Sequence, residues 1–234
     1  MKRKGYVGVV VGLAVLALAL AACGSQPESL PPAEEAPAEE SPVEEPVEEP
    51  ASGGDVFQIS TEESEARFII EEVLNGADKT VVGTAANSVT GEIVADYADT
   101  SSAQVSALRV DLSTLETDNN FRNRAIHEFI LMTGDETNQF AEFGSTAISG
   151  LPGSATVGES YPVQISGDLT IQGTTQAVTF EGTVTPVSET RLEGSASTTI
   201  TYGDFGVAIL RLPDQVASVE DTAVLEIDVV AVAQ

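Results

Sequence analysis

The chain has 234 residues and carries 37 acidic against 10 basic side chains, a formal charge of −27. This charge excludes a nucleic-acid-binding protein, because phosphate contacts need clustered Lys and Arg. A single Cys, Cys23, and a single His, His127, exclude a disulfide framework and the Cys/His metal motifs.

Residues 1–22 have the layout of a lipoprotein signal peptide. Lys2, Arg3 and Lys4 form a basic start, residues 6–19 are apolar, and Leu20-Ala21-Ala22 precedes Cys23. The run from Leu20 to Cys23 resembles the lipobox of bacterial lipoproteins. We therefore expect lipidation of Cys23 and an extracytoplasmic location, with the chain anchored to the cell membrane on the cell surface or in the periplasm. An ordinary signal peptide and an uncleaved anchor stay open, and both also export the chain.

Residues 23–54 are predicted to form a disordered tether. From Gly24 to Gly54 there are nine Glu, seven Pro and no basic residue. Such a segment cannot bury enough apolar surface to offset the entropy of ordering it, and proline and charge repulsion both extend it.

Residues 55–234 show period-two alternation in short β-branched runs separated by turn residues, which predicts an all-β domain. A sheet with one dry face must pack on another sheet or close into a barrel. The Asn75-Gly76 pair predicts a tight hairpin turn. In the run 103–112, Leu108, Val110 and Leu112 are expected on one face, and Val105, Ala107 and Arg109 on the other. The predicted strands are 56–60, 66–74, 81–86, 89–96, 103–111, 142–149, 161–171, 177–187, 191–202 and 223–233.

One stretch, residues 119–131, predicts a short amphipathic helix with Asp118 as its N-cap. Phe121, Ala125, Phe129 and Met132 fall at helical spacing, and we expect this stripe to pack on the barrel as a lid. Arg122 and Arg124 are expected to fasten the helix to acidic barrel edges. Contact with an anionic head group is the alternative.

No pattern in the sequence predicts catalysis. The sequence has no nucleophile-elbow Ser for which His127 could act as the base, and no catalytic pair can be identified among the many carboxylates. Asp96, Asp99, Asp135 and Glu136 do not match a calcium loop. We therefore expect a protein that is not an enzyme, with no catalytic residue, no metal site and no cofactor other than a bound lipid.

The apolar face of the strands is the feature best suited to function. Eight strands enclose an interior that side chains can fill or that holds one small ligand. Small residues, Gly182, Val184, Gly194, Ala196 and Thr198, favour a cavity. A filled barrel that serves as a surface interaction or structural module is the alternative. The expected lining residues are Phe68, Ile70, Leu108, Val110, Leu169, Ile171, Phe180, Ile200, Leu225 and Ile227.

Several segments resemble the YceI-like family of bacterial lipocalin-like polyisoprenoid-binding proteins. They are Ser64-Glu65-Ala66-Arg67-Phe68, Val110 to Asp118, Gly167 to Thr175 with Val178 and Phe180, and Asp204-Phe205-Gly206. Asn123 replaces the family's usual Asp, and residues 133–143 depart from its pattern. The resemblance covers residues 56–232. It implies an eight-stranded antiparallel lipocalin-like barrel with one short helix, and as partner an isoprenoid or quinone-like lipid for carriage or storage. The sequence leaves open whether the domain forms a homodimer.

Overall fold

The structure is a computed structural model that describes residues 54–234. The predicted signal peptide, Cys23 and the tether up to residue 53 lie outside the described residues, so these assignments stay predictions.

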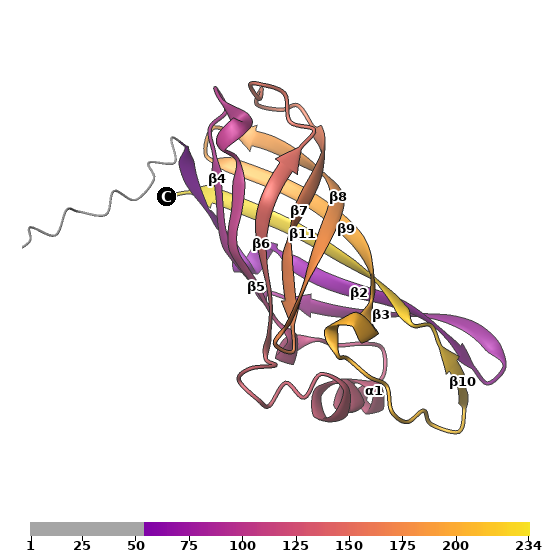
Figure 1. The fold of residues 1–234 in the computed structure, drawn as a ribbon. Coiled ribbons are helices and arrows are strands. Elements are labelled where there is room, and N and C mark those ends of the chain that lie inside the picture. The colour runs from indigo at the N-terminus through magenta and orange to yellow at the C-terminus, as the bar shows by residue number, and fades with distance from the viewer. Residues whose placement is uncertain (1–53) are drawn as a thin grey trace, which may run out of the picture. The chain divides into compact units, whose positions relative to one another are not determined.

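Eleven strands form one antiparallel sheet. The ring β1–β4–β5–β6–β7–β8–β9–β11 closes where β1 pairs with β11, with Phe57 opposite Ala233 (Figure 1). The predicted eight-stranded antiparallel barrel is therefore confirmed. The strands are β1 (Asp55–Ile59), β2 (Glu65–Leu74), β3 (Ala77–Ala86), β4 (Val89–Ala95), β5 (Gln104–Asp111), β6 (Phe140–Ser149), β7 (Tyr161–Ile171), β8 (Thr174–Ser188), β9 (Arg191–Thr201), β10 (Val216–Val219) and β11 (Thr222–Ala233).

Strands β2, β3 and β10 continue the barrel wall beyond the ring. β2 pairs with β11 next to the short β1, β3 pairs with β2 over its whole length, and β10 pairs with the end of β2. The hairpin between β2 and β3 turns at Asn75-Gly76 with φ of 52° and 78°, as the sequence predicts. β10 was not predicted, because its four residues show too little alternation to stand out.

A bulge in β5 changes the expected faces of that strand. Ala107 has φ 50°, and the register with β4 shifts between Thr90 and Glu92. Gly91 sits opposite, where a side chain would lie 2.8 Å from Leu108 Cα. The extra residue turns Val105 inward together with Leu108 and Val110, so its predicted place beside Ala107 and Arg109 was wrong.

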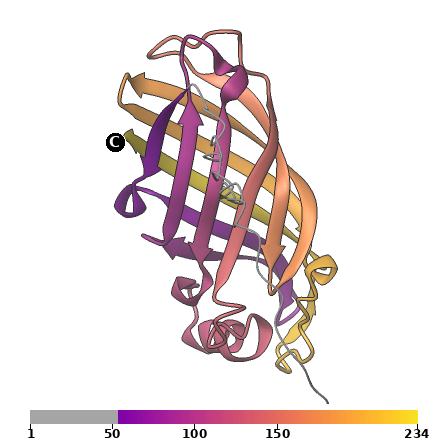
Figure 2. The same ribbon diagram turned by 60° about the vertical axis from the view of Figure 1, so that its left-hand side comes forward.

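A helical cap, residues 120–130, covers one end of the barrel, and the loops around residues 96–103 and 150–160 lie at the other (Figure 2). The cap consists of α1 (Asn120–Ala125) and a π-helical turn (Ile126–Ile130). Shorter helical turns span Thr61–Glu63, Thr100–Ser102, Leu112–Thr114 and Tyr202–Phe205.

The cap exists as predicted, but its N-cap and its packing face differ from the prediction. Asn119, not Asp118, caps the helix by accepting hydrogen bonds from the backbone N–H of Phe121 and Arg122. Phe121, Phe129 and Met132 are 88%, 68% and 48% exposed, while Ile126 is buried. Phe129 and Met132 of the predicted stripe therefore do not pack on the barrel, whereas the exposed Phe121 and the half-buried Ala125 border the cavity. The π turn adds a residue per turn, which breaks the regular helical spacing on which that prediction rested.

Candidate ligand-binding cavity

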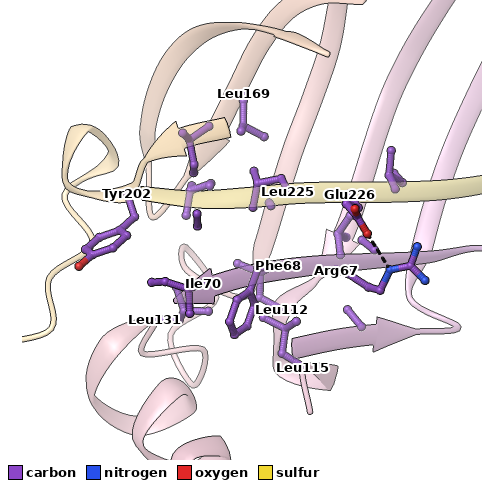
Figure 3. A pocket seen from close by; sticks show the side chains of 18 of the residues that line it. Arg67, Phe68, Ile70, Leu112, Leu115, Leu131, Leu169, Tyr202, Leu225 and Glu226 are labelled. Atoms are coloured by element: carbon purple, nitrogen blue, oxygen red, sulfur yellow. Dashed lines mark hydrogen bonds and ion pairs between the residues drawn. The ribbon is translucent and has the colours of Figure 1, made fainter. Parts of the chain in front are cut away.

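The barrel encloses an apolar cavity of about 490 Å³. Its wall follows from strand alternation, which turns every second side chain toward the lumen. In β2 this inward row is Ala66, Phe68, Ile70, Glu72 and Leu74, and in β11 it includes Leu225 and Ile227. Figure 3 draws Phe68, Ile70 and Leu225 around this space, together with Leu131 from the cap end.

The structure brings all ten predicted lining residues together around this one cavity. They come from β2, β5, β7, β8, β9 and β11, and are Phe68, Ile70, Leu108, Val110, Leu169, Ile171, Phe180, Ile200, Leu225 and Ile227. Their contact with a ligand stays a prediction. Of the small residues, Val184, Gly194 and Ala196 also line the cavity. Gly182 and Thr198 are not part of its lining.

The large aromatic side chains lie against the wall rather than across the lumen. The Phe68 ring lies over Gly83, where a Cβ would come within 2.1 Å of it, and Phe143 covers Gly167 in the same way at 2.6 Å. Phe180 packs edge-on against Phe143, with ring centroids 5.3 Å apart. Because glycines make room for these rings at the wall, the lumen is not filled by side chains as in the filled-barrel alternative.

Two buried clusters hold the wall on either side of the cavity. One is centred on β1, β4 and the end of β11 and includes Phe57, Val89 and Ala231. The other joins β5, β6, β7 and β9 with the segment after β9, and includes Phe143 and Phe205. Leu108, Leu131 and Ala141 pack against both clusters. The buried packing of the barrel is therefore provided by these two clusters in its wall.

Arg122 fastens the cap to the barrel through a chain of ion pairs. Its Nη2 lies 2.7 Å from Glu72 Oε1 on β2, and its Nη1 lies 2.5 Å from Asp118 Oδ1. Lys79 on β3 pairs with the same Asp118 at 2.7 Å. The predicted fastening role is confirmed for Arg122. It was wrong for Arg124, which is exposed and pairs with Glu128 within the cap.

Hydrogen bonds hold the two ends of the cap. At its C-terminal end, Gln172 Nε2 donates to the carbonyl oxygens of Ile130 and Leu131, each at 2.8 Å. At its N-terminal end, Asn123 Oδ1 accepts from the backbone N–H and the hydroxyl of Thr117. Asn123 stands where the resemblance predicts Asp, and its amide oxygen accepts these hydrogen bonds as a carboxylate oxygen could.

Two pKa shifts concern groups in or near the cavity. Burial raises the pKa of Tyr202, which lines the cavity, and nearby Asp221 and Glu220 add to this, so the phenol stays uncharged at neutral pH. On the rim, the hydrogen bond from Lys79, with a further one from Arg122, lowers the pKa of the exposed Asp118.

Sequence analysis missed lining residues that come from irregular segments. Leu115 and Leu131 lie outside the alternating runs, so no periodicity marks them. Glu72 was missed because an acidic residue in an inward row is indistinguishable from a surface charge until its partner is known. Val163 and Ile165 lie in the same alternating row of β7 as Leu169 and Ile171, and they also line the cavity.

The rest of the described chain adds no second site of chemical interest. His127 is not among the residues around the cavity, and its Nε2 is enclosed without a hydrogen-bond partner. Within residues 54–234, no cluster of three or more His, Cys, Asp or Glu is placed to hold a metal ion. Over the same residues, no helix has the length and apolar character needed to cross a membrane.

A closed eight-stranded barrel that keeps an apolar cavity belongs architecturally with the lipocalin-like barrels. The family model of the YceI-like domain matches residues 57–231, so the chain belongs to the YceI-like family.

Solved structures share this fold. A polyisoprenoid binding domain from Saccharophagus degradans, implicated in plant cell wall breakdown, is 17% identical with a TM-score of 0.59. It covers 76% of this chain and 98% of its own. BcnA from Burkholderia cenocepacia is 18% identical with a TM-score of 0.55, covering 74% and 98%. At this identity the likeness concerns the fold alone. No curated protein matches the sequence.

Proposed function

We propose that this protein is a membrane-tethered extracytoplasmic binding protein for an isoprenoid-tailed amphiphile, quinone-like or polyprenyl, which it carries or stores. The observation that carries this proposal is the apolar cavity of about 490 Å³ inside the closed barrel. Its size falls in the range of small-ligand pockets. A similar fold in a domain described as polyisoprenoid-binding supports the choice of ligand.

The binding energy would come from burial of the tail. Each CH₂ group removed from water contributes about 0.8 kcal/mol, so a tail of several isoprene units binds without polar contacts along most of its length. This mechanism needs a dry, continuous wall and no catalytic group. It therefore agrees with a carrier rather than an enzyme.

Native mass spectrometry of residues 54–234, followed by lipid analysis of an organic extract, tests the proposal. This part of the chain closes its own barrel and supplies both buried clusters. We expect a discrete added mass that matches an isoprenoid, or uptake of added quinones or polyprenols. A protein that stays free of ligand under both conditions would favour the surface-module alternative.

A matched pair of variants ties the binding to the cavity. Ala196→Phe places a ring in the lumen, while Ser197→Phe places the same ring on the exposed face of the same strand. We expect Ala196→Phe to lose uptake and Ser197→Phe to keep it, with both variants folded by circular dichroism. Equal uptake by the two variants would place the ligand outside the barrel.

A further inference from the structure

The two ends of the cavity differ in chemistry. At the end away from the cap, the lining includes Ile148, Leu151 and Val163, where β6 ends and β7 begins. At the cap end, the lining includes Glu72, Asn119 and Arg122. An amphiphile in this cavity would thus direct its tail away from the cap and its head group toward it.

Glu72 is the carboxylate in the inward row of β2. It follows Ile70 and precedes Leu74 in that row, and Val219 of β10 lies beside it. Its side chain is only 6% exposed, and that of Arg122 is 18% exposed. A buried ion pair at the end of an apolar cavity costs desolvation energy that a surface pair does not, so fastening alone does not require this placement.

The charges in this network already balance. Lys79 and Arg122 face Asp118 and Glu72, and Arg122 donates to both carboxylates. A phosphate head group would bring a charge of roughly −1.5 to −2 next to the buried carboxylate. It would also have to compete with two carboxylates for Arg122, so the Glu72–Arg122 pair disfavours it. The exposed Arg211 also lines the cavity, outside this network.

Glu72 keeps one oxygen available. Its Oε1 accepts from Arg122, whereas Oε2 makes no hydrogen bond with any residue of the described chain. Oε2 is also not among the fully enclosed polar atoms without a partner, so it retains accessible surface on a residue that lines the cavity. A carboxylate oxygen in this position accepts a charge-assisted hydrogen bond from an O–H or N–H donor.

We propose that the Glu72–Arg122 pair is the head-group site of the cavity and that it selects an uncharged, hydrogen-bond-donating head group, an alcohol, phenol or amide, over a phosphate. This inference rests on the proposed isoprenoid-binding function, and among quinone-like ligands it favours a phenol or quinol, because an oxidised quinone has no hydrogen-bond donor for Glu72. The tail would bind through burial of its apolar surface, and the polar contact with Glu72 would select the head group.

Three probes with the same tail separate the possibilities: geranylgeraniol, its methyl ether and geranylgeranyl phosphate. Their affinities for residues 54–234 are compared by titration calorimetry. Loss of a hydrogen bond to a charged acceptor typically lowers affinity about tenfold or more. We expect the alcohol to bind at least tenfold more tightly than the ether and than the phosphate.

Two variants separate head-group selection from cap fastening. Glu72→Gln removes the buried charge, and we expect the preference for the alcohol over the methyl ether and over the phosphate to fall by about tenfold. Asp118→Asn removes the other partner of Arg122, but Asp118 is 60% exposed and does not line the cavity. Because this variant leaves the Glu72 carboxylate in place, we expect it to change the preference for the alcohol over the methyl ether by less than threefold.

Each outcome decides something different. Binding of none of the probes would overturn the proposed function and this inference together. Binding of all three with equal affinity, or tighter binding of the phosphate, would overturn the head-group site alone. Equal shifts in Glu72→Gln and Asp118→Asn would show that the pair only fastens the cap.

Discussion

The contact between Phe68 and Gly83 gives the sharpest test of how the wall makes room for the cavity. In Gly83→Ala, the new Cβ would lie 2.1 Å from Phe68 Cε1 and 2.5 Å from Cζ. Carbon atoms in good contact are about 3.5–4.0 Å apart, so the ring must move by roughly 1.4 Å or more. The direction open to it is into the cavity, which Phe68 lines.

Overpacking of this kind costs about 1–3 kcal/mol. The contact is severe, but the cavity lets the ring move, so we expect about 2 kcal/mol, the middle of this range. The gain from replacing Gly by Ala in a strand, about 0.5–1 kcal/mol, offsets part of it. The expected net loss in free energy of unfolding is about 1 kcal/mol, measured by urea denaturation. The displaced ring should also weaken ligand uptake.

A double-mutant cycle isolates the contact. In a Phe68→Ala background, the cost of Gly83→Ala should disappear, since the clashing ring is gone. Gly144→Ala on β6 is the control, because a Cβ there meets no heavy atom within 4 Å. Its free energy of unfolding should match or exceed that of the parent. A cost for Gly83→Ala that persists without the Phe68 ring would refute the reasoning.

Two further predictions concern the cap. Gln172 has φ 50°, a conformation that Asn also tolerates, but Asn is too short to reach the carbonyls of Ile130 and Leu131. We expect Gln172→Asn to cost about 1–2 kcal/mol and to speed hydrogen exchange of cap amides, and unchanged protection would contradict this. The second prediction concerns the pH dependence of the free energy of unfolding. The lowered pKa of Asp118 means that its stabilising contribution is complete above its ordinary value of 3.8 and is lost as the pH falls through the lower folded-state value. The stability difference between the parent and Asp118→Asn should therefore be constant from about pH 7 to 5 and shrink as the pH falls below 3.8. Urea denaturation at each pH measures this difference, and a difference that stays constant through the acid range would contradict the assignment.

Local pattern was enough to predict the barrel wall. Alternation along β2, β7 and β11 assigned Phe68, Leu169 and Leu225 to one face, and a closed sheet must turn that face inward. The Asn75-Gly76 turn followed from the same local chemistry, because both residues tolerate positive φ. The resemblance to the YceI-like family then selected a barrel over a sandwich.

Features that depend on contacts between distant segments needed the tertiary structure. The bulge at Ala107 reverses the face of Val105, and it depends on the pairing of β5 with β4 and on Gly91. Phe129 and Met132 of the predicted stripe stay exposed, because the orientation of the cap is set by contacts with Gln172 and Glu72, which belong to other elements.

The sequence by itself determined the alternating apolar face, the class of fold and the absence of a recognisable catalytic pattern. Only the tertiary structure decided that the lumen stays open and that a buried ion pair lies at one end of it. The physical reason is that alternation is a property of each strand alone. The volume of the cavity, by contrast, depends on how the strands are arranged around it. The Glu72–Arg122 contact joins two residues that are 50 positions apart in the sequence.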